Sequence, residues 1–529
     1  MRVLLINPYY PISETPSPPL GLAYLAAVLS EAGIEVKVID FVVFPHSRAV
    51  LQRELEQFQP RMVGLTAVSM TFNFAIEVVR DIKQMYPDMV TVMGGPHVSF
   101  CANETLLQFP ELDIVVKGEG ERTVVDLARA IESGLSWHGV EGIVFRSGAD
   151  IHSTADRELI AELDTLPVPA RHMLPLGRYR ALGMPISLTT SRGCPFKCIF
   201  CVGRKMVGSR VRYRSPAKVV DELEHLSGLN FHQINIADDL FTANKSHCLG
   251  VCDEIINRRL QLTWTSFARV DTVSEEILTR MKAAGCSAVS FGVESGNPQI
   301  LKTIKKGITR EQVVAAVNMC RRTGITPFAS FILGLPGETP QTIQETLDFG
   351  EQLKDLGLSF GFHLLAPFPG TEIRANSHQY GIKILTDDWS QYHANRAIAE
   401  TASVDRQMLD QIVITWENEY NQLLADIKLR MQTAEASPEE VEHLTNLERI
   451  VLVYDLMMKE AVEQKGFWSN DGRPISTEQS FRTLCDRVGS MVDADPQLLH
   501  DTLSRALQQG NLNCSDVNGK TRWQWVDHI

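Results

Sequence analysis

The stretch ISLTTSRGCPFKCIFC, residues 186–201, joins a short apolar segment to three cysteines. Its first half, ISLTTS, has the composition of a buried strand. Cys194, Cys198 and Cys201 follow with the spacing C-x3-C-x2-C, and no fourth cysteine or histidine stands close by. The sequence therefore places a soft-metal site that lacks one ligand directly after a strand.

Further strands and helices alternate after this first one. The predicted strands are residues 186–191, 233–238, 263–270, 288–295, 327–334 and 359–367, and the predicted helices are residues 215–228, 245–260, 274–285, 309–324 and 339–357. Six such β/α units predict a partial (β/α)6 barrel of the TIM type over residues 184–372. Chemistry in such barrels lies on the loops after the strands, and this is where the cysteines stand.

A separate alternating series precedes the barrel, over residues 1–145. Its predicted strands are residues 3–8, 36–40, 61–68, 90–95 and 112–120, and its predicted helices are residues 20–33, 72–86 and 122–134. This order predicts an α/β, Rossmann-like domain with a parallel sheet, whose ligands lie at the carboxyl ends of the strands. The fingerprint G-x-G-x-x-G is absent after the first strand, so we do not expect a nicotinamide or flavin cofactor.

The remaining segments are a linker and a C-terminal domain. Residues 146–183 are polar and rich in proline, which predicts an extended linker. Residues 373–529 predict a mainly helical domain. One long helix there has an apolar face made by Leu409, Ile412, Trp416, Tyr420, Leu423 and Ile427. A second helix begins with a capping box at residues 437–440.

The composition of the chain disfavours several classes of protein. The chain has 529 residues, 44% of them hydrophobic, and a net charge of −13, which disfavours a nucleic-acid partner. No apolar segment is long enough for a transmembrane helix, and the N-terminus lacks the pattern of a signal peptide. We expect a cytoplasmic protein. In that compartment its ten cysteines are thiols or metal ligands rather than disulfides.

Three interpretations of the cysteine triad remain open from spacing alone. A structural zinc site needs a fourth ligand, which Cys248, Cys252 or His247 could supply. Three buried thiols would make the spacing accidental. In a [4Fe–4S] cluster, three thiolates would hold three irons and leave the fourth iron open to substrate.

The motif CPFKCIFC resembles the signature of the radical S-adenosylmethionine (SAM) superfamily. The resemblance covers roughly residues 184–372. It implies a [4Fe–4S] cluster on Cys194, Cys198 and Cys201, whose open iron binds the amino and carboxylate groups of SAM. Electron transfer from a ferredoxin or flavodoxin would then release a 5′-deoxyadenosyl radical under anaerobic conditions.

The same resemblance implies contacts to SAM. Asp238 and Asp239 end the second barrel strand, where relatives contact the SAM amino group; a helix N-cap pair is the alternative. Arg269 ends the third strand, where it would bind a carboxylate, or instead pair with Asp271. Residues implied to contact the ribose or adenine of SAM are Glu294, Phe200, Gly334 and Pro336.

Two strand ends in the N-terminal sheet resemble a cobalamin-binding domain. Thr66, Val68 and Ser69 form the first element and Gly94-Gly95 the second, and their small side chains leave room for a bulky group. The D-x-H-x-x-G motif of methionine-synthase-type domains is missing, since the loop over residues 8–19 contains no histidine. His97 is an alternative cobalt ligand, although we expect an ordinary loop residue there. A sheet without a cofactor is the other alternative.

Together the domains resemble cobalamin-dependent radical SAM enzymes, the class B methylases. The resemblance implies methylation of an unactivated carbon of a small molecule, lipid or tetrapyrrole with two SAM molecules, one methylating cobalamin and one providing the radical. Non-methylating radical chemistry, such as oxidative cyclisation of a Mg-protoporphyrin ester, is the alternative. A non-enzymatic iron–sulfur or cobalamin sensor is a third hypothesis. No catalytic acid or base is assigned, and we expect the substrate between the two α/β domains.

Overall fold

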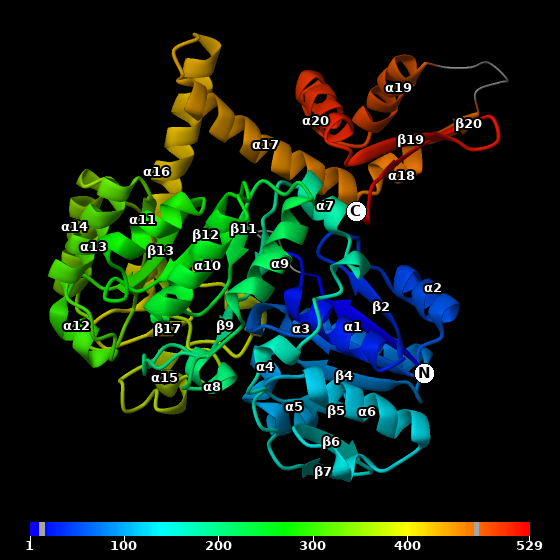
Figure 1. Cartoon of the computed structure of the whole chain (residues 1–529), viewed down its shortest axis with the longest axis horizontal. Helices are drawn as coiled ribbons and strands as arrows, with labels where there is room; N and C mark the ends of the chain where they lie inside the picture. The colour runs from blue at the N-terminus through cyan, green and yellow to red at the C-terminus, as the bar shows by residue number, and fades with distance from the viewer. Residues whose placement is uncertain (10–15, 470–475) are drawn as a thin grey trace.

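The structure is a computed structural model that describes residues 1–9, 16–469 and 476–529. Figure 1 shows an N-terminal α/β domain in blue and cyan, a second α/β domain in green, and C-terminal helices in yellow, orange and red. The chain is thus an α/β protein with the predicted order of a Rossmann-like domain, a parallel barrel-type sheet and a helical C-terminal part.

Seven strands form the N-terminal sheet, in the order β2-β1-β3-β4-β5-β6-β7. The strands are β1 (Arg2–Asn7), β2 (Glu35–Asp40), β3 (Met62–Thr66), β4 (Val90–Gly94), β5 (Ile114–Val116), β6 (Ile143–Ser147) and β7 (Asp150–Ser153). The helices are α1 (Leu20–Glu31), α2 (Arg48–Phe58), α3 (Phe72–Met85), α4 (Pro96–Ser99), α5 (Ala102–Gln108) and α6 (Glu121–Ser133). Strands β1 to β5 are parallel, and a hydrophobic layer covers each face of the sheet. The order reverses between β1 and β3, which opens a crevice at the carboxyl ends of these strands.

The hairpin β6–β7 extends this sheet into the predicted linker. Strand β6 pairs antiparallel with β5, and β7 pairs antiparallel with β6. Gly148, at φ +62°, lies in the connecting turn, and the dipeptide Ser147-Gly148 is a turn signal in the sequence. The connection between the sheets therefore starts after residue 153 and contains the short helix α7 (Leu176–Ala181).

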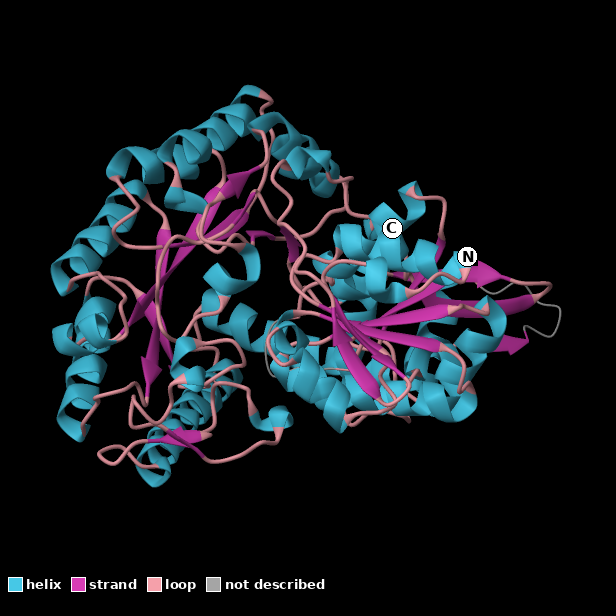
Figure 2. Cartoon of the chain, turned by 90° about the horizontal axis from the view of Figure 1, so that it is seen from below, coloured by secondary structure: helices cyan, strands magenta, loops and turns pink. Residues whose placement is uncertain are grey.

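Six parallel strands form the barrel sheet, in the order β15-β14-β13-β12-β11-β8, as predicted. They are β8 (Ile186–Leu188), β11 (Ile234–Ile236), β12 (Trp264–Ala268), β13 (Cys286–Glu294), β14 (Thr326–Leu333) and β15 (Ser359–Leu364). The main helices are α9 (Pro216–Ser227), α10 (Lys245–Asn257), α11 (Glu275–Ala283), α12 (Pro298–Thr303), α13 (Arg310–Thr323) and α14 (Pro340–Asp355). Figure 2 shows this curved sheet with helices on its outer side, next to the N-terminal sheet.

The C-terminal part contains helices and a small sheet. Its helices are α15 (Glu372–Ala375), α16 (Arg406–Gln432), α17 (Pro438–Met458), α18 (Ala461–Lys465), α19 (Thr477–Gly489) and α20 (Pro496–Gln508). Its three-stranded antiparallel sheet consists of β18 (Phe467–Ser469), β19 (Leu512–Asp516) and β20 (Lys520–Trp525). The predicted capping box at Ser437 is present. The β19–β20 hairpin was not predicted, although Asn518-Gly519, both at positive φ, is a strong hairpin signal.

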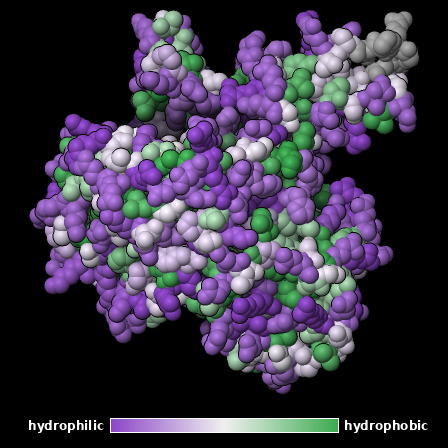
Figure 3. Space-filling view, in the orientation of Figure 1, coloured by the Kyte–Doolittle hydropathy of each residue, from purple (hydrophilic) through white to green (hydrophobic). Residues whose placement is uncertain are grey.

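The surface seen in Figure 3 is mostly hydrophilic, with apolar residues scattered among polar ones. Of the helices in the described part of the chain, none combines the length and apolar character needed to cross a membrane.

Candidate cofactor site

The three cysteines lie on one loop that leaves the first barrel strand. After β8 the chain forms the short strand β9 (Ser191–Arg192), which pairs with β10 (Arg212–Tyr213), and the cysteine loop between them includes α8 (Gly203–Val207). Gly193 permits this pairing, because its φ is +121° and a Cβ atom there would lie 2.5 Å from the carbonyl oxygen of Arg210. Cys194 and Cys198 are partly exposed and Cys201 is exposed.

No site for a single shared ion forms around the three thiols in the part of the chain that the structure describes. Among the described residues, no three His, Cys, Asp or Glu side chains are placed to hold a single ion. The candidate zinc ligands lie elsewhere, because Cys248 and Cys252 are buried in α10 and His247 Nε2 contacts the Thr190 hydroxyl at 3.0 Å. A four-iron cluster suits this loop, since each thiolate binds a different iron. Iron binding must displace the proton of each thiol, because the thiolate is the form that binds a metal.

Asp238 and Asp239, which were predicted as a pair, have different surroundings. Asp238 is 2% exposed and accepts hydrogen bonds from the Thr190 N–H and hydroxyl, both at 2.6 Å, and from the Ser191 hydroxyl at 2.7 Å. It therefore fixes the end of β8 rather than facing a ligand, and the N-cap of α10 is Asn244. Asp239 lines the cavity described below, and burial raises its pKa.

Arg269 makes the predicted alternative ion pair and keeps one nitrogen free. Its Nε and Nη2 donate to the two carboxylate oxygens of Asp271, both at 2.9 Å. Nη2 also donates to the Lys306 carbonyl at 2.8 Å, and the guanidinium lies 3.6 Å from the ring centre of Phe196. The remaining nitrogen, Nη1, is buried and has no hydrogen-bond partner among the described residues. Such a donor fits a ligand carboxylate.

Glu294 is buried against a lysine that the sequence interpretation did not include. Its Oε1 lies 2.7 Å from Lys306 Nζ, and each side chain is 8% exposed. Glu294 ends β13 at φ +71°, a left-handed conformation that is uncommon outside glycine. Lys306 also lies 5.9 Å above the ring of Phe200, so it links the predicted ribose-binding acid to the cysteine loop.

The loop after β14 contains the predicted adenine-contacting residues. Gly334 and Pro336 are buried, and neither lines the cavity described below. Glu338 accepts the N–H groups of Gly334 and Leu335 at 2.7 and 2.9 Å. Burial raises the pKa of Glu338 to about 7, and its second carboxylate oxygen has no partner in the described chain.

One cavity of about 380 Å³ joins the two α/β domains. From the N-terminal sheet it is lined by the predicted Thr66, Gly94 and Gly95, and from the barrel by Asp239 and Arg192. The predicted Val68 and Ser69 line a neighbouring hollow of about 470 Å³, which Phe368 and Tyr392 close from the barrel side.

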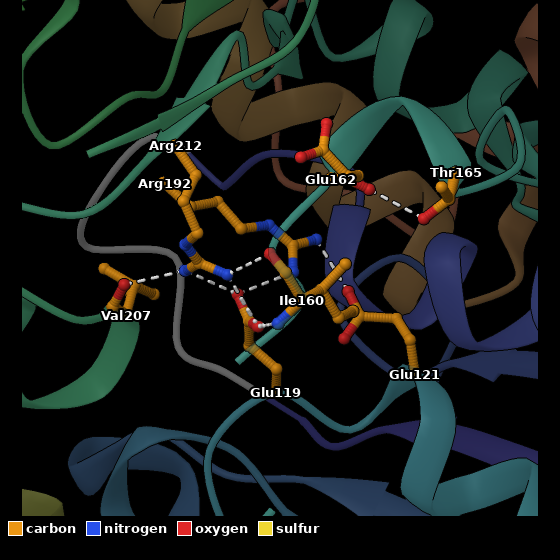
Figure 4. A network of polar contacts seen from close by, with 8 residues as sticks. All are labelled: Glu119, Glu121, Ile160, Glu162, Thr165, Arg192, Val207 and Arg212. Atoms are coloured by element: carbon orange, nitrogen blue, oxygen red, sulfur yellow. Dashed lines mark hydrogen bonds and ion pairs between the residues drawn. The ribbon is translucent and has the colours of Figure 1, made fainter. Parts of the chain in front are cut away.

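An ion-pair network holds the domains together beside this cavity. Figure 4 shows the Glu119 carboxylate between the guanidinium groups of Arg192 and Arg212. It lies 3.1 Å from Arg192 and 2.9 Å from Arg212, and its other oxygen accepts the Ile160 N–H at 2.8 Å. Arg192 also pairs with Glu121 at 2.6 Å. Burial by itself raises the pKa of Glu119, but the hydrogen bonds and the two guanidinium charges outweigh it and hold this pKa below its usual range.

His97 is a packed interface residue. It is 2% exposed, its ring stacks on Phe72 at 4.2 Å, and Trp389 meets it edge-on at 4.6 Å. Its Nδ1 lies 3.1 Å from the Ser69 hydroxyl. Burial, with a smaller effect of Arg374, lowers the pKa of His97 to about 3. The part of the proline-rich loop over residues 10–15 lies outside the described residues.

The sequence is similar to those of known proteins. The radical SAM superfamily profile matches residues 188–350, and the B12 binding domain profile matches residues 13–128. An uncharacterised methyltransferase of Pyrococcus horikoshii is 35% identical over 402 residues, which cover 74% of this chain and 86% of the relative. The anaerobic magnesium-protoporphyrin IX monomethyl ester cyclase of Rubrivivax gelatinosus is 29% identical, over 78% of this chain and 76% of the cyclase.

A solved structure has the same fold. The radical SAM methyltransferase TsrM of Kitasatospora setae, with cobalamin and a [4Fe–4S] cluster bound, superposes with a TM-score of 0.64 at 24% identity, covering 77% of this chain and 84% of TsrM. A [4Fe–4S] cluster, SAM and cobalamin are typical of such proteins. The chain therefore belongs to the family of B12-binding radical SAM enzymes, which is related to the class B methyltransferases and the anaerobic magnesium-protoporphyrin monomethyl ester cyclases.

Proposed function

We propose that this cobalamin-dependent radical SAM enzyme methylates an unactivated carbon of a small organic molecule. The observation that carries the proposal is the single cavity lined both by the strand ends predicted to bind cobalamin and by Asp239 beside the cysteine loop. One protein surface can thus hold a methyl carrier and a radical source next to each other. Methylation needs both in one chamber.

The donors around the cysteine loop fit SAM on a cluster. Cys194, Cys198 and Cys201 would hold three irons, and the free Nη1 of Arg269 would receive the SAM carboxylate. Glu294, held by Lys306, would accept the ribose hydroxyls. When bound, the cluster supplies the electron that cleaves SAM, and cobalamin supplies a cobalt that carries a methyl group.

Glycines at the strand ends leave room in the cavity between the two α/β domains for part of a bulky cofactor. Gly64, Gly94 and Gly120 line it and contribute no side chain, so the strand ends are open. At Gly94 an added Cβ atom would still lie 3.8 Å from its nearest neighbour, the Val116 carbonyl oxygen, so this space belongs to the cavity. Thr66 would supply a hydroxyl to this cavity.

The chain's own residues would orient the reactants and exclude water. The Glu119–Arg192–Arg212 network holds the N-terminal sheet against the cysteine loop. The contact of His97 with Trp389 holds the N-terminal domain against the segment that follows the barrel. We place the substrate in the hollow between Val68 and Tyr392, which is within the size range of small-molecule sites. Aromatic and aliphatic walls there favour a substrate with an apolar portion.

Oxidative cyclisation is the second candidate, and the 29% identity to a cyclase over most of the chain favours it. The residues proposed to hold SAM and cobalamin would serve both reactions equally. The two reactions differ in whether a methyl carbon enters the product.

An isotope experiment separates them. The anaerobically reconstituted protein, supplied with CD3-labelled SAM, a reductant and a small-molecule extract, should form 5′-deoxyadenosine and a product that carries the CD3 group. The Cys194→Ala variant should form neither. Formation of 5′-deoxyadenosine with a product that lacks deuterium would refute methylation and support cyclisation.

A further inference from the structure

A second cavity lies away from the cysteines, where the linker helix α7 meets α17 and α20. Its volume is about 420 Å³. Gly183 and His232 line it, and they come shortly before β8 and β11. The cavity therefore lies at the N-terminal ends of the barrel strands, opposite the cysteine loop. Figure 1 shows the end of α17 beside α7 at this junction. The cavity shares no lining residue with either hollow of the cofactor site.

Three arginines from three different helices line this cavity: Arg180 at the end of α7, Arg449 on α17 and Arg505 on α20. Within the described residues, none of them forms an ion pair with a carboxylate. Arg180 donates to neutral oxygens, namely Asn511 Oδ1 at 2.6 Å and two backbone carbonyls. Arg449 donates through Nη1 to Asn446 Oδ1 at 2.7 Å.

The positive charge in the cavity is therefore incompletely balanced. Burial, followed by the neighbouring Arg505 guanidinium, lowers the pKa of Arg449 below its usual range. The charges of Asp501 and Glu442 act on Arg449 in the opposite direction. Glu442 itself lines the cavity, so one carboxylate faces the three guanidinium groups there. Two buried polar atoms also have no hydrogen-bond partner in the part of the chain that the structure describes, Arg449 Nε and the hydroxyl of Thr502, which is 1% exposed and lines the cavity.

We propose that this cavity binds a phosphate group. Guanidinium groups recognise phosphate with paired, charge-assisted hydrogen bonds, and several converging arginines are the usual way to hold one. A buried donor without a partner costs free energy unless a ligand satisfies it. The phosphate group belongs either to a soluble phosphate ester or to an anionic lipid headgroup.

The test uses the full-length protein with inorganic phosphate as the probe. Calorimetric titration with phosphate, at ionic strength matched by chloride, should show binding. Arg449→Met and Arg505→Met should each weaken that binding by about tenfold or more, the loss of one charged hydrogen-bonding partner. Arg482→Met, which removes an exposed arginine of α19, is the control and should bind as the wild type does. If a methionine variant does not fold, Arg449→Lys replaces it in the titration, because lysine keeps the positive charge but loses the paired hydrogen bonds of the guanidinium.

Two sources of the phosphate are then distinguished. Flotation with phosphatidylglycerol vesicles, compared with phosphatidylcholine vesicles, should recover the protein in an Arg449-dependent way if the ligand is a headgroup. Arg449-dependent phosphate binding without vesicle binding identifies a soluble ester. Absence of both, or binding that the arginine variants leave unchanged, overturns the proposal.

Discussion

Replacing Glu119 by glutamine should loosen the junction between the two α/β domains. The carboxylate is 6% exposed and lies within 3.1 Å of two guanidinium groups, which are themselves 14% and 9% exposed. Removing one partner of a buried ion pair costs about 3–5 kcal/mol. Since glutamine keeps one accepting oxygen and Arg192 keeps Glu121, we expect the lower end, about 3 kcal/mol.

Hydrogen exchange measures this local cost directly. The Ile160 N–H donates a hydrogen bond to Glu119. In Glu119→Gln this amide and the amides near Arg192 should exchange about 100-fold faster, because each 1.4 kcal/mol of lost local stability raises the exchange rate about tenfold. Asp156→Asn is the matched control, since Asp156 pairs with Lys117 but is 86% exposed, and it should change exchange by no more than about fivefold. Equal exchange in Glu119→Gln and wild type, or an equally large effect of the control, would refute the assigned role of the network.

Three further predictions follow from buried groups and from the cavity. Lys306→Met should destabilise the fold by about 3–5 kcal/mol, because it leaves the Glu294 carboxylate buried and unpaired. The double variant Lys306→Met/Glu294→Leu should recover most of this loss. Thermal unfolding of both variants measures the difference. His97 has a pKa of about 3 when folded and 6.5 when unfolded, so only the unfolded state gains this proton between those values. Its contribution to stability should fall by about 1.4 kcal/mol per pH unit below 6.5, and unfolding at pH 7 and pH 5 should show that slope reduced in His97→Phe. Gly94→Val should abolish hydroxocobalamin binding, measured by absorbance after gel filtration, and leave the iron content unchanged, because its methyl groups enter the cavity beside β4; undiminished binding would place the cofactor elsewhere.

Local patterns were sufficient to predict the parallel strands of the two α/β domains and the cysteine loop. Apolar β-branched segments separated by amphipathic helices fixed the six barrel strands and the first five strands of the N-terminal sheet. The Cys194–Cys201 spacing marked the loop because it depends on neighbouring residues only. The β6–β7 and β19–β20 hairpins were missed although Ser147-Gly148 and Asn518-Gly519 signal their turns.

Long-range pairing was not predictable from one sequence. Lys306 is 12 residues from Glu294 along the chain, and Glu119 is 73 residues from Arg192, so neither partner could be assigned by spacing. Asp238 and Asp239 are adjacent in sequence, yet only the three-dimensional position of Thr190 and Ser191 turns the first away from the cavity. The direction in which a side chain points at a strand end depends on residues of the neighbouring strand, and one sequence alone does not reveal those contacts.

The most direct test of two cofactors in one chamber is low-temperature electron paramagnetic resonance of the reduced, reconstituted protein. We predict a cobalt signal and an iron–sulfur signal in the same sample, with the iron–sulfur signal changing when SAM is added. Cys194→Ala should lose only the iron–sulfur signal, and Gly94→Val only the cobalt signal. A protein that retains tetrahedral zinc, with no iron–sulfur signal and no response to SAM, would contradict the account.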